Sequence, residues 1–179
     1  MIGQSEKESR SRALLDVADK MLIAARTAPK TRGRETLSMK IVASEAEKVL
    51  IATKMKEIGI RTGAHFFERD AKNLMDSEAI VLFGSSIQTM QLPNCGLCGY
   101  ENCTEKEKHP DIPCAYNPLD LGIAIGSAVS IAMDNRVDNR VMYTVGMAIL
   151  ELNLLGNDVK LAFGIPLSAT SKNIFFDRK

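Results

Sequence analysis

The sequence predicts a single globular domain of helices and strands that is interrupted by a cysteine-rich loop. Three observations support this prediction. Apolar residues recur at helical spacing in several segments, short apolar runs of strand type lie between them, and all four cysteines fall within residues 95–114. With 179 residues, 45% of them hydrophobic, the chain is long enough to bury a core without cross-links. We therefore predict one domain over residues 1–179, with the cysteine-rich loop at residues 87–117.

The N-terminal part of the chain predicts a helix, a basic loop and a strand. Apolar residues at helical spacing predict an amphipathic helix over Ala13–Ala28, and Pro29 ends it. The segment Pro29–Glu35 is basic and contains a glycine, which is typical of a loop. A strand is expected next, alternating around Met39 and Ile41.

A helical hairpin and a buried strand are expected before the cysteines. Ser44 and Glu47 have the spacing of a capping box, so a helix should begin there and end near Gly59. A second helix is predicted over Ala64–Met75. The continuous apolar run Ala79–Phe83 is typical of a strand that is covered on both faces, which places it inside a sheet rather than at its edge.

The C-terminal part predicts two more helices and a final strand. Asn117 is expected to cap a buried helix over Leu119–Met133, and an amphipathic helix is predicted over Asp138–Leu152. Alternating residues then predict a strand at Val159–Phe163. The tail retains two adjacent phenylalanines, which include Phe175, so it is expected to dock on the domain or on a partner chain.

A stripe of small residues runs along the predicted Leu119–Met133 helix. Gly122, Gly126 and Ser130 recur at every fourth position and permit close approach of another backbone. Tight helix packing, a cofactor and a second subunit are the three interpretations of this stripe.

Composition excludes several classes of function. Lys plus Arg is 23 and Asp plus Glu is 22, so the formal charge of +1 gives no support to a nucleic-acid partner. The stretch Leu119–Met133 is too short and too polar to cross a membrane. Residues 1–12 lack the apolar core of a secretory signal, so the protein is expected to be cytoplasmic. The only histidines are His65 and His109, and no nucleophile elbow or Walker loop supports hydrolytic chemistry or a nucleotide cradle.

The cysteine spacing favours a metal centre over disulfides. Cys95, Cys98, Cys103 and Cys114 are separated by two, four and ten residues, and two disulfides within such a short loop would constrain little of the chain. In reducing cytosol a cysteine quartet indicates metal binding or redox work. We predict these four residues as the metal ligands.

Spacing leaves the identity of the metal open between iron and zinc. One short Cys-x-x-Cys pair followed by wider gaps is less typical of zinc, which often uses two such pairs, and it favours a [4Fe–4S] cluster. Gly96 and Gly99 each follow a cysteine, where a positive φ or a close approach of the backbone to the cluster is expected. His109 could replace one cysteine as a ligand, although it is typical of a solvated loop residue.

Two resemblances extend this interpretation. The segment 95–103, with residues 120–127, 138–142 and 164–178, resembles a family of bacterial and archaeal proteins that contain a ferredoxin domain, and this resemblance covers nearly the whole chain. It implies a [4Fe–4S] cluster. More weakly, residues 14–42, in particular Ala24–Pro29, and the later Gly164-Ile-Pro166 are similar to nitroreductase-like flavoproteins. This second resemblance implies an α+β fold with a mixed sheet packed against helices, a homodimer, and FMN held across the subunit interface.

Candidate flavin residues come from two charged segments. Arg26, Lys30, Arg32 and Arg34 place four cations within nine residues, a density that could bind a phosphate. Lys172 and Asn173 in the tail could complete a polar pocket. The basic loop departs from the nitroreductase pattern, which has small residues there, and the upstream phosphate-binding arginines of that family are matched only loosely at residues 10–12.

The resulting hypothesis is a redox protein with an iron–sulfur cluster, acting in electron transfer or as a flavin-linked reductase. A noncatalytic module with a structural or sensory cluster is one alternative. A structural zinc protein is the other. Whether the protein is an enzyme, and which redox partner it uses, stays open from sequence.

Overall fold

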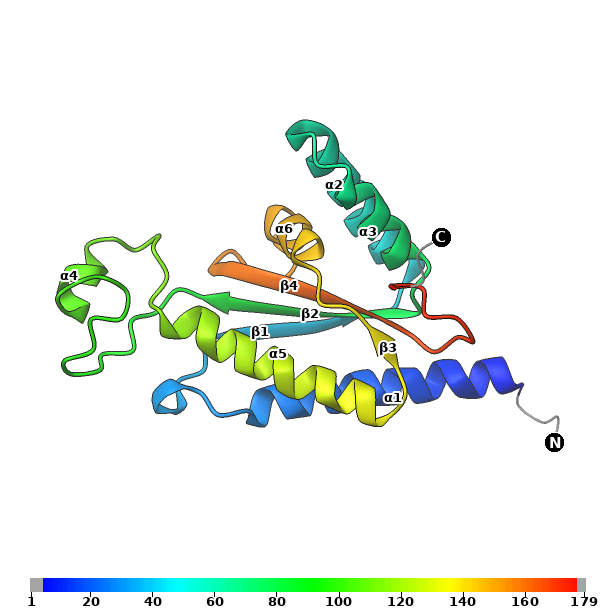
Figure 1. Cartoon of the computed structure of the whole chain (residues 1–179), viewed down its shortest axis with the longest axis horizontal. Coiled ribbons are helices and arrows are strands. Elements are labelled where there is room, and N and C mark those ends of the chain that lie inside the picture. The colour runs from blue at the N-terminus through cyan, green and yellow to red at the C-terminus, as the bar shows by residue number, and fades with distance from the viewer. Residues whose placement is uncertain (1–4, 177–179) are drawn as a thin grey trace.

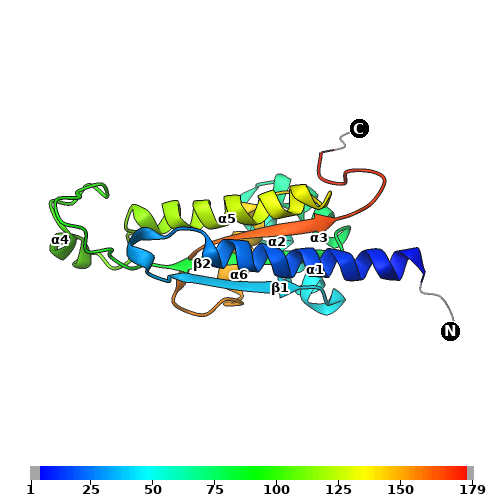
Figure 2. The ribbon, with the colours of Figure 1, turned by 90° about the horizontal axis from the view of Figure 1, so that it is seen from below.

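The computed structural model of the chain describes residues 5–176. A four-stranded sheet lies between two layers of helices (Figure 1, Figure 2). The strands are β1 (Leu37–Val42), β2 (Ala79–Ser86), β3 (Asp138–Asn139) and β4 (Val159–Ser168), and their order in the sheet is β1-β2-β4-β3. Every pairing among these strands is antiparallel, whereas the resemblance implies a mixed sheet. The α+β class is confirmed.

Two long helices cover one face of the sheet. They are α1 (Glu6–Thr27) and α5 (Tyr116–Asp134), which lie side by side (Figure 2). Helix α1 begins before the predicted Ala13, because Ser5 and Glu8 form a capping box that satisfies its first N–H groups. Its apolar stripe, which includes Met21, packs with α5 and the sheet into one hydrophobic core.

Three helices cover the opposite face. They are α2 (Glu45–Thr62), α3 (Phe66–Met75) and α6 (Tyr143–Glu151). Helix α2 opens at Ser44 as predicted, but it continues past Gly59 and ends at Gly63, whose φ of 69° provides the left-handed cap. Gly59 serves packing instead, since a Cβ there would lie 2.9 Å from the Cβ of Phe67 on α3.

The strands differ from the prediction mainly in length. Strand β2 is central, and residues 79–83 are fully buried, as the apolar run predicts. Strand β4 does not end at Phe163 but continues through Pro166 to Ser168. The helix predicted from Asp138 begins only at Tyr143, because Asp138 and Asn139 pair with the end of β4.

The cysteine-rich segment joins β2 to α5 and projects beyond one end of the sheet (Figure 1). It contains the short helix α4 (Cys103–Glu107). The basic loop between α1 and β1 contains the one-turn 3-10 helix η1 (Thr31–Gly33) and lies at this same end of the molecule. The chain's last described residues dock as predicted, because Phe175 is buried in the core of the opposite helical layer. Residues 1–4 of the N-terminal segment and 177–178 of the tail lie outside the described range.

Candidate metal centre

All four predicted metal ligands line one cavity. Cys95, Cys98 and Cys103 are half-buried and Cys114 is 5% exposed. None of the four forms a disulfide. Apolar and uncharged residues complete the wall: Met90, Leu92, Gly96, Tyr100, Asn102, Ala115 and Tyr116. No carboxylate or histidine of the described residues lines the cavity, so its donor set is four thiols.

The four cysteines share one cavity, but their sulfur atoms do not stand at coordination distance from a single central point. The cavity is narrow, about 10 Å³ in volume. Within residues 5–176, no three His, Cys, Asp or Glu side chains stand at the spacing that a single metal ion requires. The chemistry of the donor set fits an iron–sulfur cluster or zinc, since both bind thiolates.

The backbone of the loop turns sharply at the positions that the sequence singled out. Gly96 has φ 62° and Gly99 has φ 85°, so both occupy the left-handed region that favours glycine. The Gly99 N–H donates to the Gly96 carbonyl oxygen at 3.0 Å and closes a turn between Cys95 and Cys103. The positive φ predicted at these two glycines is confirmed.

Asn117 closes the base of the cysteine loop. Its side-chain Oδ1 accepts from the N–H of Cys114 at 3.0 Å and from the N–H of Gln88 at 3.3 Å, and its Nδ2 donates to the Gln88 carbonyl at 3.0 Å. The residue is fully buried in the first turn of α5. It is therefore not the helix cap that its sequence position suggests; the cap position is Ala115. Asn117 instead ties the two ends of the loop together.

The basic loop braces the same segment from the side. Arg34 donates to the Thr89 carbonyl at 2.8 Å, and Arg32 donates to the Gln91 carbonyl at 2.9 Å. Glu107 of α4 accepts from the side chains of Thr89 and Gln91. These bonds connect the chain entering the cysteine loop both to η1 and to the helix that carries Cys103.

Asp120 connects the basic loop to α5. Its carboxylate accepts from the N–H of Thr31 at 3.0 Å and from the Thr31 hydroxyl at 2.9 Å. Asp120 is 2% exposed, so these bonds offset the cost of burying its charge. Sequence reasoning missed both Asn117 and Asp120 as site residues; the available signal was a pair of polar residues at the start of an apolar helix.

The candidate flavin residues lie in two separate places. Arg26 pairs with Glu35 at 2.5 Å, and Lys30 donates to three carbonyl oxygens at the C-terminal end of α1. Arg32 braces the cysteine loop as described. Lys172 and Asn173 follow β4, beside α3, toward the other end of the sheet. The described chain does not bring the two groups together in one pocket.

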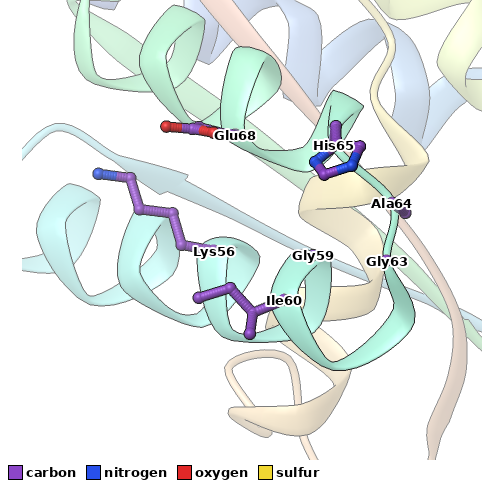
Figure 3. Close-up of a pocket in the computed structure, with 7 residues that line it drawn as sticks. All are labelled: Lys56, Gly59, Ile60, Gly63, Ala64, His65 and Glu68. Atoms are coloured by element: carbon purple, nitrogen blue, oxygen red, sulfur yellow. The ribbon is translucent and has the colours of Figure 1, made fainter.

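Two of the pockets that lie away from the cysteines have charged side chains in their walls. One, of about 450 Å³, is lined by side chains from α1 and the strand ends: Lys7, Arg10, Ser11, Leu14, Leu15, Ala43, Glu78 and Thr170. The Nε of Arg10 and the Oε1 of Glu78 are buried there without a hydrogen bond among the described residues, and they face each other as an ion pair at 3.9 Å. The other pocket, of about 380 Å³, lies between α2, which contributes Lys56 and Ile60, and the start of α3 with the turn before it, which contribute Glu68 and His65 (Figure 3).

Comparison with known proteins identifies the family. A family model described as "Uncharacterized protein containing a ferredoxin domain" (DUF2148) matches residues 111–178. A protein of Archaeoglobus fulgidus is 37% identical over 183 residues, which cover 97% of this chain and 96% of the relative. The chain belongs to this ferredoxin-domain family. The residues matched by the family model include Cys114 and the bracing residues Asn117 and Asp120, while the other three cysteines precede them.

Solved structures show that this ferredoxin-domain protein has the nitroreductase fold. Nitroreductase A of Vibrio parahaemolyticus superposes with a TM-score of 0.58 at 12% identity, over 88% of this chain and 59% of that one. A Bacteroides thetaiotaomicron protein described as a putative NADH dehydrogenase/NAD(P)H nitroreductase gives 0.57 at 13% identity, over 100% and 84%. An FMN-dependent nitroreductase of Clostridium difficile gives 0.57 at 16% identity, over 88% and 76%. The chain thus spans about three fifths of the Vibrio enzyme's length.

Proposed function

We propose that Cys95, Cys98, Cys103 and Cys114 bind a [4Fe–4S] cluster and that the protein works as an electron-transfer component or a flavin-linked reductase. The observation that carries this proposal is the single cavity lined by all four cysteines and by no other metal-binding side chain of the described residues. The ferredoxin-domain family description and the nitroreductase fold both support redox chemistry.

Bound, such a cluster would supply one-electron steps. The chain's own contribution would be to hold the four thiolates, to shield them, and to tune the potential through N–H groups and nearby charges. Asn117 would restrain the backbone of Cys114, and Arg32 and Arg34 would restrain the entry to the loop. A rigid loop of this kind would limit reorganisation when the charge of the site changes.

One preparation tests the proposal. Protein purified without oxygen should contain iron and sulfide, show a broad absorption band that dithionite bleaches, and contain no stoichiometric zinc. Flavin is quantified on the same sample. Stoichiometric zinc without iron would instead establish the structural zinc alternative, which the four-thiol donor set also supports. A bound cluster that exchanges no electrons with reduced ferredoxin or flavin would favour a structural or sensory role.

We further propose FMN as a second cofactor, since solved proteins of the same fold are described as FMN-dependent. The predicted residues Arg26, Lys30 and Arg32 already form an ion pair or hydrogen bonds with other parts of the chain. Lys172 and Asn173 lie apart from them, after β4. The Arg10 pocket is a second candidate place for the phosphate, because it has an unbonded guanidinium nitrogen and the volume to admit a ligand. Its Arg10 Nε makes no hydrogen bond among the described residues, and Lys7 adds a second cation. Arg10 also pairs with Glu6, its Nε lies 3.9 Å from the Glu78 carboxylate, and Ser11 already donates to Glu78, so a phosphate would compete with these carboxylates.

A homodimer through the outer face of α5 completes the proposal. This helix is apolar on both faces: one face packs on the sheet, while Leu119 is 52% exposed, Ile123 37% and Met133 67% on the other. Gly122 and Gly126 lie on that same exposed stripe, and a Cβ at either would meet nothing within 4 Å. Helices that are apolar all round are normally buried, so we assign a second copy of the chain to this face.

No helix within residues 5–176 combines the length and the hydropathy needed to cross a bilayer. We propose a cytoplasmic location, where free thiols persist and an oxygen-sensitive centre is protected. The electron donor and acceptor are left open.

A further inference from the structure

A lysine is buried in the cysteine loop, one helical turn after Cys103. Lys106 is 2% exposed, although it belongs to the projecting loop. It follows Cys103 by three residues on α4, so both side chains leave the same face of that helix. Cys103 lines the cysteine cavity, and Lys106 is buried one helical turn after it without being part of the cavity wall.

No hydrogen bond or ion pair within residues 5–176 engages the ammonium group of Lys106, which keeps only a small contact with solvent. Lys48, the other buried lysine of that range, provides a comparison: it pairs with Glu45 at 2.8 Å and donates to the Ser77 carbonyl at 3.1 Å. The carboxylates nearest Lys106 in sequence are engaged elsewhere. Glu105 pairs with Lys108, and Glu107 accepts from Thr89 and Gln91.

A cation held largely out of water is stabilised by an anion beside it, and the described residues supply none to Lys106. Four thiolates give a cysteine-ligated centre a net negative charge, and reduction by one electron adds another unit. A fixed positive charge nearby therefore favours binding of the centre and favours its reduced form more than its oxidised form.

We propose that Lys106 is the counter-charge of the four-cysteine centre, binding to an anionic metal–thiolate group and raising its reduction potential. This inference rests on the proposed function. It adds to that function a specific residue that sets the redox potential without serving as a ligand.

The test replaces the charge while keeping the length of the side chain. Lys106→Met removes the charge and Lys106→Arg retains it. Lys108→Met, in which an exposed lysine two positions along the chain is changed, is the matched control. For each anaerobic protein, iron and sulfide content and the reduction midpoint, followed by electron paramagnetic resonance, are measured.

We expect Lys106→Met to lower the ratio of reduced to oxidised cluster roughly tenfold at a fixed applied potential, as expected for losing a unit charge near the centre. Lys106→Arg and Lys108→Met should stay within about twofold of wild type. If Lys106→Met takes up no iron, restoration by Lys106→Arg supports the counter-charge, and failure of both variants overturns it.

Two other outcomes are decisive. A Lys106→Met protein with full iron content and an unchanged midpoint overturns the counter-charge and leaves the cluster proposal standing; the side chain would then contribute packing alone. A wild-type protein without iron overturns the cluster proposal, and the inference about Lys106 falls with it.

Discussion

The side chain of Asn117 holds the backbone of Cys114, accepting its N–H at 3.0 Å. The same amide makes two bonds with Gln88, 29 residues earlier in the chain, so one fully buried residue joins the start and the end of the cysteine loop. Asn117 does not line the cysteine cavity. It would therefore affect a bound metal indirectly, by holding the backbone of the loop in place. That makes it a positioning residue in our proposal.

Asn117→Ala should loosen the loop and weaken metal retention. The change leaves the N–H groups of Cys114 and Gln88 without their acceptor, at a cost of about 1–3 kcal/mol for each group that stays buried. We expect iron to be lost faster to a chelator than in wild type, measured by the decay of cluster absorbance without oxygen. Asn135→Ala, at an exposed amide at the end of α5, is the control. Equal rates of iron loss in all three proteins would contradict the clamp.

Cys98→Ser should abolish cluster binding and leave the domain folded. The two hydrophobic cores lie on either side of the sheet and include none of the four cysteines, so the helices can pack without the metal. Iron content, circular dichroism and the size of the assembly are measured on anaerobic protein. Leu97→Ser, at a neighbouring side chain 66% exposed, should retain the metal. Unfolding of Cys98→Ser would show that the metal organises the domain.

Sequence patterns predicted the elements whose apolar faces are regular. The strand at residues 79–83 and the amphipathic part of α1 follow from periodicity, because burial on a sheet face imposes it. The ends of the helices were harder to predict from the sequence. Gly59 was predicted to end a helix, yet its place is set by the close approach of Phe67 on another element, which local sequence does not report.

The cysteines could be predicted as a set, but the residues that position them could not. Four cysteines in a short loop indicate metal binding by their residue type and spacing alone, and in the structure all four line one cavity. The roles of Asn117, Asp120 and Arg34 depend on partners 29, 89 and 55 residues away, respectively. Asparagine, aspartate and arginine fit helix caps and solvated loops equally well. Only the folded structure therefore reveals the long-range hydrogen bonds that these three residues make.

Ile123→Glu should dissociate the proposed dimer. Ile123 lies on the exposed stripe of α5 beside Gly122 and Gly126, where a second α5 could approach closely, and a carboxylate there would be desolvated without a partner. Sedimentation velocity should show a dimer for wild type and a monomer for the variant. The control is Ile60→Glu, which changes an apolar side chain 85% exposed on α2 in the opposite helical layer. A dimer in both variants would exclude the α5 face.

Arg10→Ala should weaken FMN binding, if the Arg10 pocket holds the phosphate. Loss of a hydrogen bond to a charged group corresponds to roughly tenfold or more in affinity. Arg32→Ala should change it by less than about twofold, because Arg32 lies outside the Arg10 pocket and its guanidinium donates to backbone carbonyls of the cysteine loop. Flavin fluorescence quenching on titration gives both affinities. A larger loss of affinity in Arg32→Ala than in Arg10→Ala would indicate that the basic loop binds the phosphate. If wild type binds no FMN, the FMN proposal is wrong.

Gly146→Ala should be among the most destabilising single substitutions in the chain. Gly146 lies in α6 with ordinary helical geometry, so alanine would improve its helix propensity in isolation. A Cβ at this position would lie only 1.8 Å from the Ala162 carbonyl oxygen of β4, and the backbone on both sides would have to move apart. We expect a loss of roughly 3 kcal/mol or more in the free energy of unfolding, measured with urea. Gly63→Ala is the matched control, since its Cβ would meet nothing within 4 Å and only the positive φ of 69° opposes it, at about 1 kcal/mol. Equal costs in the two variants would mean that α6 does not approach β4 so closely.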